Sequence, residues 1–221
     1  MTLGPQSASK TDRPGLVHAG RQIEEESFRI IDAEIGDHGF SPAEWEIARR
    51  VVHATGDFEY AGLMRFRPKA LASGIAALRQ GNSILVDTRM IQSGISPWRL
   101  QWFGNAVETP PADPDSQQWA ETMGTTRSVA AFRYYSGRLD GGIVAIGNAP
   151  TALLEVLRLV REDGFRPALV IGVPVGFVQA AESKEALWQS EDLPAITVLG
   201  RKGGSSVALA ILHALLELAR A

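Results

Sequence analysis

Residues 142–160 read GIVAIGNAPTALLEVLRLV, and they predict a strand, a tight turn and a helix. The run from Ile143 to Ile146 has no polar residue, which is typical of a strand buried on both faces of a parallel sheet. Gly147 permits a turn that a Cβ atom would obstruct, and Pro150 suits the first turn of a helix. We expect the backbone N–H groups at this helix start to favour a negative charge above the sheet.

The same pattern occurs twice more along the chain. Residues 168–174 (ALVIGVP) and 195–200 (AITVLG) are apolar runs that each lead into a further helix. The glycines that end the three runs, Gly147, Gly172 and Gly200, are separated by about 25 to 30 residues, which matches βα units. The three units predict an α/β fold with a mainly parallel sheet between two helical layers, a Rossmann-like α/β/α single domain.

The expected ligand site follows from this topology. Open parallel sheets bind ligands at the carboxyl ends of their strands. We therefore place the site over Gly147, Pro174 and Gly200.

The rest of the chain is consistent with one domain over residues 16–221, preceded by a flexible segment over residues 1–15. Ser41-Pro42-Ala43-Glu44 is a capping box with proline at the first helical position. We expect strands at 64–67 and 83–87 and another within 97–107, a proline-rich surface loop at 109–114, and helices over 20–35, 42–54, 68–80 and 88–92. A long helix that holds Arg127 is expected over 115–139, with Gly124 as the place where it could bend.

Composition excludes several classes of protein. The 221 residues contain no cysteine, which excludes disulfides, thiolate metal sites and a cysteine nucleophile, and fits a cytoplasmic protein. The net charge of −3 argues against a nucleic-acid partner. No apolar run approaches the ~20 residues of a membrane span.

His53 is the best-placed acid or base among the four histidines. It falls in the last turn of the helix over 42–54, where the helix dipole stabilises an imidazolium and suits a proton donor near neutral pH. The alternative is a capping histidine that binds the last carbonyl groups of that helix.

Basic residues gather, by topology, near the predicted ligand edge. Arginine and lysine there suit carboxylate or phosphate groups, whereas the alternative for any single residue is a solvated surface position. These residues are Arg89, Arg127, Lys184, Arg201 and Lys202.

Several familiar motifs are absent from the sequence. There is no phosphate-binding P-loop, no dinucleotide fingerprint, no nucleophile elbow and no metal-ligand spacing. The residues alone therefore predict an α/β protein that holds a multiply anionic small molecule, with one histidine as the available acid.

Six segments together resemble the precorrin-8X methylmutases, the precorrin isomerases of cobalamin biosynthesis, and the resemblance runs from about residue 20 to the C-terminus. The combination of GNAPTA and GVPVGFV is specific. The segments are 52–56 (VHATG), 84–87 (ILVD) with Met90 and Gly94, 124–128 (GTTRS), 145–153 (AIGNAPTAL), 172–184 (GVPVGFVQAAESK) and 200–205 (GRKGGS).

The resemblance implies an isomerase that moves a methyl group from C11 to C12 of precorrin-8X or cobalt-precorrin-8. The product is hydrogenobyrinate or cobyrinate. Such a shift needs no cofactor, protein metal or nucleophile. The family's catalytic histidine carries over to His53, which would protonate the conjugated ring system.

The resemblance also implies the substrate contacts and the assembly. The partner molecule is a tetrapyrrole, and the family forms homodimers with the site near the subunit interface. The residues expected to bind substrate are Ser27, Arg89, Arg127, Asn148, Gly176, Lys184 and Arg201.

Residues 97–114 match the family only loosely. Two other functions stay open at this point: a non-catalytic corrinoid carrier, and a sugar-phosphate or nucleotide enzyme. An absorbance change on adding substrate distinguishes the isomerase from the carrier, and stabilisation by phosphates would favour the third.

Overall fold

The structure is a computed structural model that describes residues 14–138 and 140–221. The chain divides into two units, Met1–Gly36 and Asp37–Ala221. Helix α1 (Pro14–Ile35) is the described part of the first unit, and it begins at Pro14 rather than at Gly20 as expected. Of the predicted flexible segment over 1–15, residues 1–13 lie outside the described residues.

The second unit holds the sheet and the remaining helices. Its strands are β1 (Met64–Phe66), β2 (Ile84–Val86), β3 (Val107–Glu108), β4 (Ile143–Ile146), β5 (Leu169–Gly172) and β6 (Ala195–Val198). Its helices are α2 (Pro42–Thr55), α3 (Glu59–Leu63), α4 (Ala70–Arg79), α5 (Arg89–Gly94), α6 (Pro97–Leu100), α7 (Ser116–Met123), α8 (Arg127–Tyr135), α9 (Pro150–Glu162), α10 (Ala180–Gln189) and α11 (Ser205–Arg220), with short 3-10 turns η1 (Pro110–Ala112) and η2 (Ser136–Arg138).

The strands form one six-stranded sheet in the order β1-β6-β5-β4-β2-β3. Strands β2 to β6 pair in parallel, with Ile143 of β4 opposite Leu169 of β5. Among the strands of the described residues, β1 alone is antiparallel, and its first residue, Met64, lies opposite Val198 at the end of β6. The predicted α/β fold with a mainly parallel sheet is confirmed, and so are the three βα units.

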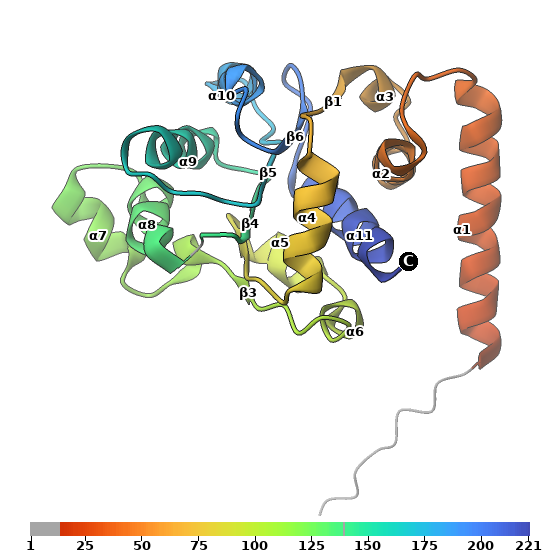
Figure 1. The fold of residues 1–221 in the computed structure, drawn as a ribbon, viewed down its shortest axis with the longest axis horizontal. Helices are drawn as coiled ribbons and strands as arrows, with labels where there is room; N and C mark the ends of the chain where they lie inside the picture. The colour runs from red at the N-terminus through yellow and green to blue at the C-terminus, as the bar shows by residue number, and fades with distance from the viewer. Residues whose placement is uncertain (1–13, 139) are drawn as a thin grey trace, which may run out of the picture. The chain divides into compact units, whose positions relative to one another are not determined.

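Helices cover both faces of the sheet. Helices α8, α9 and α10 pack against one another on one face, while α2, α4 and α5 pack around α11 on the other (Figure 1). Every residue of β2, β4, β5 and β6 is buried, which explains why these strands show no polar alternation.

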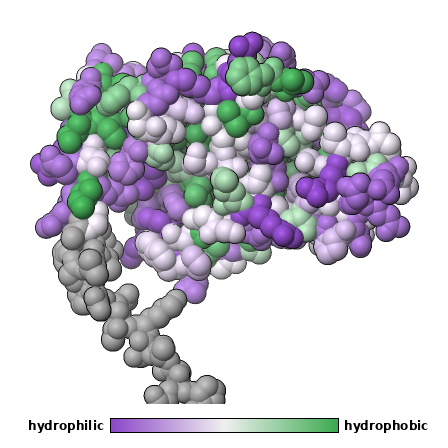
Figure 2. All heavy atoms as spheres, turned by 180° about the vertical axis from the view of Figure 1, so that it is seen from behind, coloured by the Kyte–Doolittle hydropathy of each residue, from purple (hydrophilic) through white to green (hydrophobic). Residues whose placement is uncertain are grey.

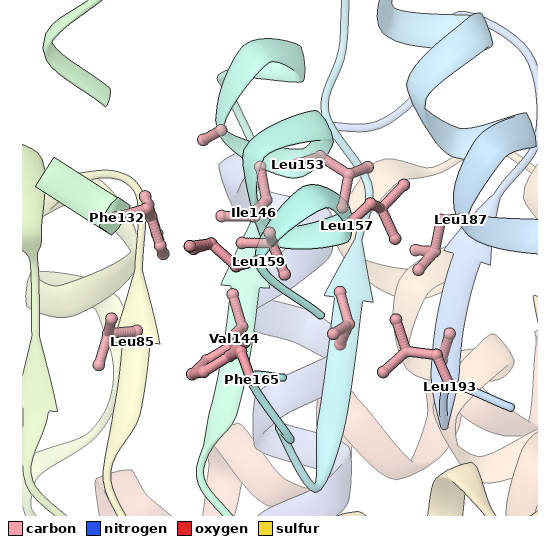
Figure 3. Packing of buried hydrophobic residues seen from close by; sticks show 14 residues of the cluster. Leu85, Phe132, Val144, Ile146, Leu153, Leu157, Leu159, Phe165, Leu187 and Leu193 are labelled. Carbon is pink, nitrogen blue, oxygen red and sulfur yellow. The ribbon is translucent and has the colours of Figure 1, made fainter. Parts of the chain in front are cut away.

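One hydrophobic core lies between the sheet and the α8–α10 layer. Figure 3 shows Leu153 and Leu157 of α9 lying over β4 and β5, with Leu187 of α10 and Phe132 of α8 on either side. Burying each such side chain contributes about 1.5–3 kcal/mol. This packing fixes the turn between β4 and α9 against the sheet edge.

The predicted long helix over 115–139 is wrong. Helix α7 ends at Gly124, which is left-handed at φ 62°, and α8 begins after Thr126, whose hydroxyl accepts the N–H of Val129. A left-handed glycine followed by an N-cap threonine breaks the helix completely. Arg127 is consequently the first residue of a new helix.

Two expectations for the neighbouring region are also corrected. Residues 97–107 contain helix α6 as well as the start of strand β3. The predicted surface loop at 109–114 contains the turn η1, in which Pro110 and Pro111 are buried. Prolines pack there because they leave no backbone N–H to satisfy.

The capping box at the start of α2 is confirmed: Ser41 and Glu44 bind each other's backbone N–H groups.

Hydrophilic residues cover most of the surface seen from behind, interrupted by smaller hydrophobic groups (Figure 2). Among the described residues, no helix combines the length and the hydropathy that crossing a membrane requires.

Candidate functional site

The turns that follow β2, β4, β5 and β6 lie at the same edge of the sheet, because these strands are parallel neighbours. The antiparallel β1 brings its preceding helix, α3, to this edge as well. The edge predicted from the three βα units is therefore the edge where these turns meet.

Asp87, directly after β2, holds the turn after β4. Its carboxylate accepts the backbone N–H groups of Gly147 at 3.0 Å, Asn148 at 2.7 Å and Ala149 at 2.8 Å. The carboxylate is almost fully buried, and burial raises the pKa of Asp87, although the three N–H groups act in the opposite direction. These backbone donors therefore bind a protein carboxylate, whereas the sequence predicted that they face a ligand.

A cavity of about 470 Å³ opens beside this turn. Three of the predicted substrate ligands line it: Arg89 at the start of α5, Arg127 at the start of α8, and Asn148. All three side chains are exposed, and Arg89 also donates to the carbonyl of Ala112 at 3.2 Å. The break between α7 and α8 thus brings Arg127 to the sheet edge, where two guanidinium groups suit a carboxylate.

The turn after β6 is held from several sides. Lys184 is fully buried, and its ammonium donates to the carbonyl of Lys202 at 2.5 Å; burial lowers the pKa of Lys184 to about 8. Lys202 forms ion pairs with Asp57 and Glu59, and the hydroxyl of Tyr60 donates to the carbonyl of Gly203. Of the three basic residues at this turn, Arg201 is exposed, Lys202 is half-buried and Lys184 is buried.

Glycines allow these turns to approach one another closely. A Cβ atom on Gly147 would lie 2.8 Å from Cα of Ser205, and one on Gly203 would lie 2.2 Å from the carbonyl oxygen of Val173. Any side chain at either position would displace backbone. The hydroxyl of Thr88 also lies 3.0 Å from that of Ser205, which joins the β2 turn to the start of α11.

The turn after β5 presents apolar side chains to solvent. Phe177 is 84% exposed and Val178 is 80% exposed. The backbone N–H of Gly176 donates to the carbonyl of Arg201, and the Arg201 guanidinium lies 5.4 Å from the centre of the Phe177 ring. The β5 and β6 turns together present an apolar surface beside a cation, which suits an amphipathic ligand.

His53 lies in the last turn of α2, as predicted, and its side chain is exposed. Helix α2 ends at Gly56, which is left-handed at φ 63°. Asp57 then pairs with Lys202 of the β6 turn. Since four residues span at most about 14 Å of chain, His53 lies within that distance of Asp57.

Ser27 lies on α1, which belongs to the first unit. Its hydroxyl donates to the carbonyl of Ile23 at 2.8 Å, one helical turn back.

Sequence reasoning missed two residues that shape this edge, Asp87 and Tyr60. Asp87 was assigned only to the end of a strand. Its position directly after a buried strand was a signal, because carboxyl ends of parallel strands meet in the folded sheet. Nothing local marked Tyr60, whose partner is 143 residues away.

Comparison with known families identifies the chain. The model of the precorrin-8X methylmutase family, CbiC, matches residues 22–218. The chain belongs to the precorrin-8X methylmutase family. It is accordingly an isomerase of cobalamin biosynthesis, as the resemblance of its motifs implied.

Similar precorrin-8X methylmutases carry two kinds of name. A cobalt-precorrin-8 methylmutase of Leptospira interrogans is 45% identical over 210 residues, covering 92% of this chain and 96% of the relative. A precorrin-8X methylmutase of a Sinorhizobium species is 44% identical over 200 residues, covering 90% of this chain and 95% of the relative. The chain is equally similar to both.

The fold agrees with a solved structure of the same family. The crystal structure of the precorrin-8X methylmutase of Thermus thermophilus superposes with a TM-score of 0.84 at 52% identity. The match covers 90% of this chain and 96% of that one.

Proposed function

We propose that this isomerase moves a methyl group from C11 to C12 of precorrin-8X or of cobalt-precorrin-8, giving hydrogenobyrinate or cobyrinate. The bond between the methyl carbon and C11 breaks while the bond to C12 forms. Substrate and product are isomers, so no oxidant or co-reactant is consumed. A proton lent to the ring system during the shift must return to the protein.

The observation that carries this proposal is that Arg89 and Arg127 line one cavity at the sheet edge, while Asp57, four residues after His53, pairs with Lys202 of the neighbouring β6 turn. The site must hold a macrocycle with several carboxylates and supply one acid. Arg89 and Arg127 line the cavity, and Arg201 lies on a neighbouring turn. His53 does not line this cavity, but it is exposed at the end of α2. We assign His53 as the acid that protonates the conjugated ring, since imidazolium donates protons near neutral pH.

The other proposed substrate ligands differ in how far their side chains are exposed to solvent. Asn148 offers its exposed side chain, and the turn around Gly176 offers the apolar ring of Phe177 to a face of the macrocycle. Lys184 is fully buried, so we propose that it supports the β6 turn from beneath through the carbonyl of Lys202. Ser27 remains a proposed substrate ligand on α1.

We further propose that the protein acts as a homodimer in the cytoplasm. Trp98 is 47% exposed, and an exposed tryptophan is a residue that interfaces favour. Light scattering or analytical ultracentrifugation of the purified protein measures the assembly directly.

The decisive experiment adds substrate to purified protein and to the His53→Ala variant. Wild-type protein should change the absorbance spectrum from that of precorrin-8X to that of hydrogenobyrinate. The variant should fold, bind the product and lose turnover. Wild-type turnover in the variant would refute the role of His53, whereas product binding without turnover in the wild type would make the protein a carrier.

A further inference from the structure

The strongest further observation outside the proposed ligands is the carboxylate of Asp87. Three consecutive backbone N–H groups, of residues 147, 148 and 149, converge on its two oxygens at 2.7–3.0 Å. They lie at the start of α9, a helix of 13 residues. A carboxylate there is stabilised by charge-assisted hydrogen bonds and by the helix dipole.

Asp87 fills the position that an anionic ligand would otherwise occupy. Its side chain is nearly inaccessible to solvent, yet Asp87 lines the same cavity as Arg89, Arg127 and Asn148. A substrate carboxylate therefore cannot bind these three N–H groups while Asp87 is present. It is directed instead to the two exposed guanidinium groups.

The same hydrogen bonds fix Asn148. Its backbone is bound on one side by Asp87, and its side chain is left exposed at the cavity. The turn cannot adjust by moving towards α11, because Gly147 already lies against Ser205. The β4–α9 turn forms one wall of the cavity. The orientation of this wall therefore depends on the carboxylate of Asp87, which follows a different strand, β2.

We propose that Asp87 is a positioning residue whose carboxylate acts as a built-in anion, shaping the β4–α9 turn so that substrate carboxylates bind Arg89 and Arg127. The proposal rests on the proposed function only for the identity of the substrate. Whether the three N–H groups form an anion position can be tested without any corrinoid.

The first experiment is chemical rescue of Asp87→Ala. The substitution should empty the anion position and weaken binding of hydrogenobyrinate about tenfold or more. Sodium formate supplies a carboxylate of matching size, so it should raise the Tm of the variant more than that of the wild type, and restore part of the affinity. Sodium chloride at equal ionic strength is the control.

Glu155→Gln is the matched control variant. Glu155 is a second buried carboxylate, on α9, but it pairs with Arg133 of α8 and Arg158 of α9 and does not line the cavity. The substitution should lower the Tm, leave the affinity for hydrogenobyrinate unchanged and gain nothing from formate. A merely structural role for Asp87 would make the two variants behave alike.

Asp87→Asn decides the case if the alanine variant does not fold. It keeps the side-chain volume but turns an amide N–H towards backbone N–H groups, so the affinity should again fall. Wild-type affinity in either folded variant overturns the proposal, and so does formate that stabilises Asp87→Ala without restoring any affinity. If wild-type protein does not bind hydrogenobyrinate, the proposed function fails. The rise in the Tm of Asp87→Ala with formate still tests whether the three N–H groups form an anion position.

Discussion

Lys202 lies 2.6 Å from the carboxylate of Glu59 and also forms an ion pair with Asp57. These contacts join the turn after β6 to the segment that follows α2. His53, the proposed acid, lies four residues before Asp57 in the chain. Arg201, a proposed substrate ligand, directly precedes Lys202. The ion pair between Asp57 and Lys202 therefore links the two segments that carry these residues.

The ion pair predicts an acid-dependent loss of stability. The hydrogen bond that Asp57 accepts from Lys202 holds the pKa of the Asp57 carboxyl below the ordinary value of 3.8. A carboxyl group whose folded pKa is lowered stabilises the fold above its unfolded pKa, and that contribution disappears as pH falls through the folded pKa. The Tm of the wild type should therefore fall more steeply below about pH 4 than that of Asp57→Asn.

Measurement of Tm against pH checks this expectation, with Glu182→Gln as the control for removal of an exposed acid. Near neutral pH the effect of Asp57→Asn should be small, since exposed ion pairs contribute little. Parallel curves for wild type and Asp57→Asn would show that the pair carries no pH dependence.

Arg127→Gln should weaken binding of hydrogenobyrinate by about tenfold or more, because a hydrogen bond to a charged group contributes about 1.5–3 kcal/mol. Stability should change little, since the side chain is exposed. Titration followed by absorbance measures the affinity.

Arg161→Gln removes the same charge from an exposed position on α9 that lies outside the cavity. Its affinity should equal that of the wild type. Equal losses in the two variants would mean that Arg127 acts only through the overall charge of the protein.

Gly147→Ala should destabilise the fold by about 2–3 kcal/mol, because its Cβ would lie 2.8 Å from Cα of Ser205, and only a shift of the backbone could relieve the overlap. Gly137→Ala is the matched control, since nothing lies within 4 Å of its Cβ position. Urea unfolding of both variants compares the two free energies. Similar stability in the two would show that the β4 and β6 turns can separate without cost.

Phe177→Ser should keep the Tm of the wild type, because a ring that is 84% exposed contributes little to folding. The affinity for hydrogenobyrinate should fall, since the ring would lose its contact with the macrocycle. Unchanged affinity would remove the β5 turn from the proposed site.

A relative named cobalt-precorrin-8 methylmutase and one named precorrin-8X methylmutase are 45% and 44% identical to this chain. A metal chelated at the centre of the macrocycle need not touch the protein, so we expect turnover of both substrates with rates within about tenfold. Rates measured on matched preparations of precorrin-8X and cobalt-precorrin-8 check this. A complete loss of activity on one of them would show that the site discriminates between them.

Local features of the fold could be predicted from the sequence because each depends on neighbouring residues. The buried run Ile143–Ile146 followed by Gly147 and Pro150 predicted a βα unit, and Ser41 with Glu44 predicted the start of α2. The family motifs likewise occur as continuous segments. The error at Gly124 arose because a single glycine bends some helices and ends others.

The sequence by itself determined the α/β class, the parallel βα units, the edge where the turns after these strands meet, and the family, because all of these follow from periodicity and from short continuous motifs. Only the tertiary structure decided that Asp87 binds the N–H groups after β4, that Lys184 is buried beneath the β6 turn, and that Arg127 shares a cavity with Arg89. The physical reason is that hydrogen bonds and burial between residues distant in the chain depend on how the packed layers bring their ends together.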